Sequence, residues 1–211
     1  MYFLSRDLFF PSVETADKHG LLAVGGDLSP ERLMLAYRNG IFPWFEDDEP
    51  ILWWSPNPRM ILFFEDLVVS KSMRNILNRG IFEVTFNADF RSVISNCKKI
   101  KREGQTGTWI TNEIVEAYCR LHEMGIAQSV EVWKNGELVG GLYGVDLGHI
   151  FCGESMFSKV SNASKVAFIS LVKHLQQNNY RLLDCQLHND HLESLGCREI
   201  PRQEFITALK L

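Results

Sequence analysis

Three polar side chains in the last third of this 211-residue chain have the types and spacing needed for acid–base chemistry. Asp184 and Gln186 end one short apolar run, and Glu154 follows another, which covers residues 150–152. Residues two apart in a strand share one face, so Asp184 and Gln186 are expected side by side. A carboxylate and an amide so placed can orient an amine and accept its proton. A structural hydrogen-bonded pair would use the same residues, because buried polar groups need partners.

The elements that would position these groups form a strand, helix, strand pattern over residues 148–196. A fifteen-residue helical pattern separates the two apolar runs, and Glu154 is expected just beyond the strand at 148–153. Upstream, Asn135-Gly136 between two alternating segments is a strong hairpin signal. Glycines in the second of these segments predict a bulge or a ligand backbone passing close by. They are Gly140, Gly141 and Gly144.

The first 58 residues differ from the remainder, because they contain six of the seven prolines. Ser29 and Pro30 predict the start of a helix that ends near Asn39. Three tryptophans follow among the prolines. For Trp44, packing between two domains and a platform for a base or an aromatic side chain are equally favoured, whereas Trp53 and Trp54 are expected to pack.

Composition narrows the class of protein. The formal net charge is -4, yet residues 59–102 contain nine Lys or Arg and four Asp or Glu, a local charge of +5. Such a basic segment suits a polyanion, although solvated helix faces would also produce it. The chain has no apolar run of membrane-spanning length and no export signal, so its five cysteines are expected to be reduced thiols.

Two other kinds of chemistry are disfavoured. Cys185, His188, His191 and Cys197 provide zinc-type ligands, but their spacing fits no standard zinc module. The segment around Ser155 lacks the second glycine of a nucleophile elbow, because Phe157 stands there. A metal centre and a covalent acyl-enzyme are therefore both minor alternatives.

Six blocks of sequence form an ordered pattern that spans nearly the whole chain. They are residues 25–33 (Gly-Gly-Asp-Leu-Ser-Pro-Glu-Arg-Leu), 40–45 (Gly-Ile-Phe-Pro-Trp-Phe), 52–59 (Leu-Trp-Trp-Ser-Pro-Asn-Pro-Arg), 107–111 (Gly-Thr-Trp-Ile-Thr), 153–158 (Gly-Glu-Ser-Met-Phe-Ser) and 184–196 (Asp-Cys-Gln-Leu-His-Asn-Asp-His-Leu-Glu-Ser-Leu-Gly). Together they resemble the bacterial leucyl/phenylalanyl-tRNA–protein transferase family.

This resemblance implies an enzyme that moves Leu or Phe from Leu-tRNA or Phe-tRNA to the N-terminal Arg or Lys of a protein. The new peptide bond creates an N-end rule degradation signal. The implied fold is α/β (α+β), with a small N-terminal α/β domain at 1–58 and a GNAT-like catalytic domain at 59–211. The latter has a mixed, largely antiparallel sheet flanked by helices. The resemblance implies no metal and no cofactor, and we expect a cytoplasmic monomer with no membrane contact.

The resemblance also implies roles for individual residues. Asp184 and Gln186 match a catalytic pair in which Asp184 takes the amine proton directly or through Gln186, and Glu154 matches an acid near the cationic acceptor. The donor side-chain pocket is expected to comprise Leu142, Gly153, Met156, Phe168, Leu171 and Leu183. Expected tRNA contacts are Trp44 and Trp109 near the 3′ adenosine, and Lys71, Arg74, Arg79 and the run 98–102 along the backbone. Leu142, Phe168 and Leu171 depart from the family pattern, which puts the Leu against Phe preference in doubt.

Two alternatives remain. A GNAT-like domain is also typical of acyl-CoA-dependent N-acetyltransferases, but the pyrophosphate loop of those enzymes is absent, because residues 158–163 (Ser-Lys-Val-Ser-Asn-Ala) precede the helix instead. A tRNA-binding module without catalysis would share the basic segment and the aromatic residues.

Overall fold

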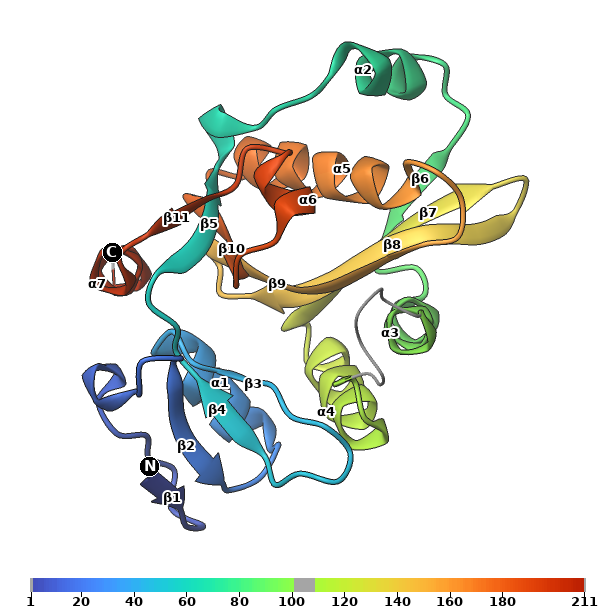
Figure 1. Ribbon diagram of the computed structural model, residues 1–211. Helices are drawn as coiled ribbons and strands as arrows, with labels where there is room; N and C mark the ends of the chain where they lie inside the picture. The colour runs from blue at the N-terminus through green and yellow to red at the C-terminus, as the bar shows by residue number, and fades with distance from the viewer. Residues whose placement is uncertain (1, 101–108, 211) are drawn as a thin grey trace.

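The computed structural model describes residues 2–100 and 109–210, and two β-sheets organise it (Figure 1). The smaller sheet has the order β1-β2-β4-β3. Helix α1 packs beside it, and the Ser29 hydroxyl caps this helix by accepting from Arg32 N–H, as expected. The elements of this part are β1 (Tyr2–Leu4), the 3-10 turn Val13–Thr15, β2 (Leu21–Gly25), α1 (Pro30–Arg38), β3 (Phe42–Pro43) and β4 (Leu52–Trp54).

The larger sheet has the order β11-β5-β10-β9-β8-β7-β6. Strands β9 and β10 pair parallel, and the other neighbours among the described strands of this sheet pair antiparallel. The expected mixed, largely antiparallel sheet is therefore confirmed. Its strands are β5 (Arg59–Phe63), β6 (Glu83–Phe86), β7 (Ala127–Lys134), β8 (Glu137–Asp146), β9 (Ile150–Ser158), β10 (Leu182–Gln186) and β11 (Arg198–Ile200).

Helices flank this sheet on both faces, with α5 on one face and α3 and α4 on the other (Figure 1). Asp89 caps α3 by accepting from Ser92 N–H. Asn87 has a φ of 57° in the preceding turn, and its side chain accepts from Ser129 N–H. A 3-10 turn covers Phe64–Asp66. The helices are α2 (Lys71–Asn78), α3 (Phe90–Lys99), α4 (Asn112–Glu123), α5 (Ala163–Gln177), α6 (Asp190–Glu193) and α7 (Arg202–Leu209).

The strand, helix, strand pattern is confirmed as β9, α5 and β10, and α5 has the expected fifteen residues. Strand β9 continues to Ser158, so Glu154 lies inside the strand. This corrects the expectation from the sequence that Glu154 follows the end of the strand. A register shift between β8 and β9 occurs at Tyr143 and Gly144, close to Glu154. No described helix is long and apolar enough to cross a membrane.

The glycines of β8 are required by packing. A Cβ at Gly140 would lie 2.5 Å from the Ala163 side chain, so α5 approaches the strand directly at this point. A Cβ at Gly144 would lie 2.2 Å from the carbonyl oxygen of Cys152, at the bulge. The bulge predicted from these glycines is present, and neighbouring protein atoms account for the close approach.

The hydrophobic core is continuous between the two sheets. One cluster of buried side chains includes Leu22 and Trp53 beside the small sheet together with Tyr118 and Phe205 of the larger unit. Trp53 is completely buried and its indole N–H donates to Gly25 O at 2.8 Å, as expected for a packing tryptophan. The small sheet and the large sheet therefore share one hydrophobic core, although residues 55–58 separate them in the chain.

Candidate active site

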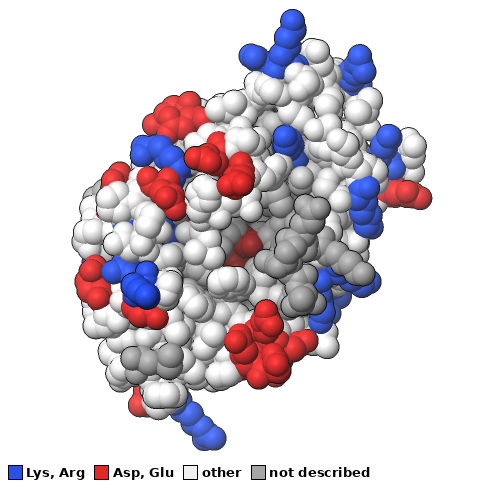
Figure 2. Space-filling view, viewed as in Figure 1, with Lys and Arg blue, Asp and Glu red and all other residues white. Residues whose placement is uncertain are grey.

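Two adjoining cavities lie where β9 and β10 face α5 and the small-sheet unit. The larger has a volume of about 450 Å³ and the smaller about 80 Å³. Figure 2 shows a hollow near the centre of this face with acidic atoms at its base. The residues that belong to both walls are Glu154, Ser155, Met156, Cys185, Gln186 and Leu192.

The smaller cavity gathers every residue expected in the apolar donor pocket. These residues come from β8, β9, α5 and β10, four elements that are far apart in the chain but adjacent in the fold. The helical period of α5 places Phe168 and Leu171, three residues apart, on the face that lines the cavity. The expected residues that line it are Leu142, Gly153, Met156, Phe168, Leu171 and Leu183.

The larger cavity has both tryptophans that were expected near a base. Trp44 and Trp109 are partly buried and line it, and the Trp44 ring lies 5.6 Å from the Trp54 ring. The indole N–H of Trp54 donates to the backbone oxygen of Trp44 at 2.7 Å, which fixes the backbone position of Trp44. Aromatic faces exposed in a cavity offer a surface on which a base can stack.

Glu154 is the only carboxylate that the described residues contribute to either wall. Its Oε1 accepts from Gln186 Nε2 at 2.7 Å and its Oε2 accepts from the Tyr118 hydroxyl at 3.2 Å. Burial, with a smaller contribution from the nearby Asp184 charge, raises the pKa of Glu154 to about 7 against the opposing effect of hydrogen bonds from Tyr37, Gln186 and Tyr118. Glu154 is thus able to change its protonation state near neutral pH.

Two buried tyrosines connect Glu154 with the small-sheet unit. Tyr118 of α4 donates to Glu154, and its hydroxyl is also hydrogen-bonded to the hydroxyl of Tyr37 on α1. Both rings are almost completely buried, at 0% and 1% exposure. The position of the Glu154 carboxylate therefore depends on helices from both units of the fold.

Asp184 occupies a different position from the one expected. The strand bulges between Asp184 and Gln186, and Gln186 has a φ of 65°. The regular two-residue alternation that would place both side chains on one face is therefore interrupted, and of the two only Gln186 lines the cavities. Asp184 is 0% exposed and accepts the backbone N–H of Gln186 at 3.0 Å.

Arg59 explains why Asp184 can be buried. Its guanidinium donates to both oxygens of Asp184, at 2.8 and 2.7 Å, and is itself 1% exposed. A two-bond pair of this kind satisfies a carboxylate that water does not reach. The geometry makes Asp184 a support for the backbone of Gln186, and it does not bring the carboxylate to the cavity.

Three of the basic residues expected to contact a nucleic acid, Lys71, Arg74 and Arg79, are exposed. Lys71 and Arg74 lie on α2 and Arg79 follows it. Figure 2 shows Lys and Arg side chains over α2 and along the right of this face, whereas most acids lie to the left and below. Lys98 and Lys99 end α3, while Lys101 and Arg102 lie outside the described residues.

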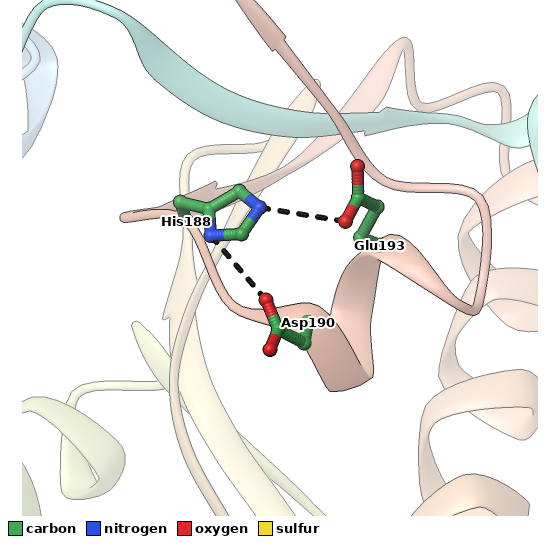
Figure 3. A group of neighbouring side chains, drawn as sticks. All are labelled: His188, Asp190 and Glu193. Carbon is green, nitrogen blue, oxygen red and sulfur yellow. Dashed lines mark ion pairs between the residues drawn. The ribbon is translucent and has the colours of Figure 1, made fainter.

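The zinc-type ligands separate into two groups. Cys185 and Cys197 have their sulfur atoms 3.6 Å apart, and the thiol pKa of Cys185 is raised by its contact with Cys197 and by burial. His188 instead turns toward Asp190 and Glu193, at 3.8 and 3.5 Å (Figure 3). Those three are the only group within residues 2–100 and 109–210 with metal-binding proximity, and all are exposed. The four-residue zinc arrangement is therefore not formed.

Tyr37, Tyr118 and Arg59 were not identified from the sequence as site residues. Tyr118 follows the apolar period of its helix, and Tyr37 is buried on the same face of its short helix as Leu33 and Ala36. Arg59 offered one signal, because a lone cation opens an otherwise apolar strand. A buried cation of this kind requires an anion, which the sequence does not identify.

Comparison with known proteins finds a distant solved structure and much more similar relatives in sequence. A solved structure of a GCN5-related N-acetyltransferase from Kribbella flavida is 8% identical, covers 81% of this chain and 60% of its own, and has a TM-score of 0.38. Relatives named leucyl/phenylalanyl-tRNA--protein transferase include one from Flavobacterium johnsoniae, 69% identical over 100% of this chain and 99% of its own length. One from Christiangramia forsetii is 57% identical, over 99% of this chain and 100% of its own.

Family models agree with these relatives. The description "Leucyl/phenylalanyl-tRNA protein transferase" matches residues 61–210, and that of the family's N-terminal domain matches residues 26–57. The chain belongs to the leucyl/phenylalanyl-tRNA protein transferase family.

Proposed function

We propose that this protein transfers Leu or Phe from an aminoacyl-tRNA to the N-terminal Arg or Lys of an acceptor protein, forming a peptide bond. The observation that carries the proposal is an apolar cavity that adjoins a larger one, with the polar side chains of Glu154 and Gln186 in the wall that they share. One cavity suits an apolar donor side chain, and the other suits a cationic acceptor. The modified protein would carry an N-end rule degradation signal.

The donor side chain is assigned to the smaller cavity. Leu142, Phe168 and Leu171 provide apolar walls from β8 and α5, and Gly153 leaves space along β9. A Leu or Phe side chain gains free energy there by leaving water, at roughly 25 cal/mol for each Å² buried. A polar or charged donor would lose its hydration without compensation.

The terminal adenosine and the tRNA backbone are assigned to the surroundings of the larger cavity. Trp44 and Trp109 offer aromatic faces at its wall, and Lys71, Arg74 and Arg79 offer exposed cations along α2. Base stacking supplies affinity without sequence specificity, and phosphate contacts make it salt-dependent. The proposed domains, 1–58 and 59–211, would both contact the donor.

The acceptor is assigned to the polar side of the larger cavity, where Glu154 supplies negative charge. The amide oxygen of Gln186 can accept a hydrogen bond from the acceptor amine, while Asp184 holds the backbone of Gln186. Aminoacyl esters are already activated. Positioning the ester and the amine together therefore supplies much of the lowering of the activation barrier, at best about 7–11 kcal/mol.

One assay tests the proposal. Purified protein is mixed with Leu-tRNA or Phe-tRNA and with peptides headed by Arg, Lys or Ala, and the extended peptides are counted by mass spectrometry. We expect products with Arg and Lys only. A parallel reaction with acetyl-CoA tests the N-acetyltransferase alternative, and tRNA binding without any product would favour a binding module. We further propose that a monomer acts in the cytoplasm, because one chain forms both cavities and charged tRNA is the donor.

A further inference from the structure

Peptide-bond formation between an amine and an ester requires a group that accepts the amine's proton. Asp184 is poorly placed for this task, because it is 0% exposed and both of its oxygens accept from Arg59. It also lies outside the walls of both cavities. A base must come within about 3 Å of the proton that it takes, directly or through one water molecule.

Glu154 satisfies that requirement. It lies at the junction of the two cavities, where a donor ester seated by its side chain would meet an amine from the larger cavity. Three side chains fix the carboxylate: Gln186 on β10, Tyr118 on α4 and, behind it, Tyr37 on α1. These contacts hold it in one orientation while leaving it in contact with the cavity.

We infer that Glu154 is the catalytic base that accepts the α-amine proton of the acceptor, and that Tyr118 and Tyr37 are positioning residues for it. This inference rests on the proposed function and deepens it, because it assigns the proton transfer to a residue expected only to bind the cationic acceptor. Asp184 and Arg59 then act through the backbone of Gln186.

The proton transfer conserves atoms and charge. The neutral α-amine attacks the carbonyl carbon of the aminoacyl ester, a nitrogen–carbon bond forms, and one nitrogen proton passes to the Glu154 carboxylate. The bond from that carbon to the ribose oxygen of the tRNA then breaks, and the protonated Glu154 returns the proton to the departing oxygen. The products are an amide and a free tRNA hydroxyl, with Glu154 ionised again.

The electrostatic surroundings suit a base that works near neutral pH. Burial raises the pKa of Glu154 to about 7, although hydrogen bonds from Tyr37, Gln186 and Tyr118 lower it, and a base is most effective with a pKa near the working pH. The remaining ionisable groups that face Glu154 come from four elements or their ends. They are Asp184 on β10, Arg59 on β5, Cys152 on β9, and His188 and His191 at the cavity wall.

The decisive variant is Glu154→Gln, which keeps the size of the side chain and one accepting oxygen, removes its basicity and replaces the other accepting oxygen with a donating NH2 group. At saturating Arg-headed peptide we expect kcat to fall by about 10²-fold or more, and KM to rise as well, because Glu154 also supplies the negative charge of the acceptor site. If Glu154 only binds the acceptor's cation, KM will rise while kcat is retained, and the inference is overturned. Absence of transfer by the unmodified protein would instead overturn the proposed function.

A second variant keeps the inference testable if Glu154→Gln folds poorly. Tyr118→Phe removes a hydrogen bond that lowers the pKa of Glu154, so the rise of kcat with pH should move to higher pH. Tyr180→Phe is the matched control. The Tyr180 hydroxyl donates to Asp146 at 2.8 Å, and neither residue lines either cavity. A Tyr118→Phe profile that coincides with the Tyr180→Phe profile would contradict the inference.

Discussion

The guanidinium of Arg59 and the carboxylate of Asp184 form two parallel hydrogen bonds, of 2.8 and 2.7 Å, in the interior of the protein. The third nitrogen of Arg59 donates to Gly40 O at 3.2 Å, and the group lies between the rings of Phe42 and Phe205. This single cation therefore joins the small-sheet unit, the large sheet and α7. Through Asp184 it also fixes the backbone N–H of Gln186.

Removing Arg59 should destabilise the fold strongly. Arg59→Leu leaves Asp184 buried without its partner, and we expect a loss of about 3–5 kcal/mol in the free energy of unfolding, measured by urea titration. The double variant Arg59→Leu with Asp184→Leu should recover most of that stability, because no buried charge remains. The exposed pair Arg91–Glu116 provides the control, and Arg91→Leu should change stability little.

Stability should depend on pH through Glu154. Its pKa is about 7 in the folded protein, above the ordinary value of 4.5, so the folded state binds more protons than the unfolded chain between those values. Stability is therefore lost as pH rises from about 4.5 through 7. Glu154→Gln removes this loss, and thermal melts should show a larger relative stabilisation at pH 8 than at pH 5. The exposed Glu137→Gln should show no such difference.

Donor selectivity should respond to the volume of the smaller cavity. Leu171→Phe fills part of it, and we expect transfer of Phe to fall more than transfer of Leu. One methylene in an apolar pocket is worth about 10–200-fold in kcat/KM. Leu175→Phe is the control, because Leu175 is buried on the same helix but does not line the cavity. Equal losses for both donors in Leu171→Phe would remove this cavity from donor recognition.

The exposed cations of α2 should determine the salt dependence of tRNA binding. Lys71→Ala or Arg74→Ala each removes one cation that can pair with a phosphate, and should flatten the slope of log K against log salt by about 0.7–0.9. Filter binding or anisotropy at several salt concentrations measures that slope. Lys18→Ala, an exposed cation next to the small sheet, should leave it unchanged. An unchanged slope in all three variants would place the tRNA elsewhere.

Sequence patterns predicted the central elements, and the family resemblance predicted the wall of the smaller cavity. Periodicity predicted the strand, helix, strand unit of β9, α5 and β10, and the resemblance predicted Leu142, Phe168 and Leu183, which line the smaller cavity. Strand β9 was predicted to end too early, because Glu154 interrupts an apolar run although it lies within the strand. Local propensity does not register a polar residue that the interior satisfies.

The sequence by itself determined which kinds of side chain meet at the site: apolar side chains, an amide and two carboxylates. Only the tertiary structure decided which carboxylate faces the cavity. Arg59 lies 125 positions before Asp184, and the bulge at Gln186 reverses the expected face, so Asp184 is buried in an ion pair. Tyr37 and Tyr118, 81 positions apart, meet beside Glu154. Such partners are determined by chain topology and by the need to satisfy buried polar groups, which no local pattern encodes.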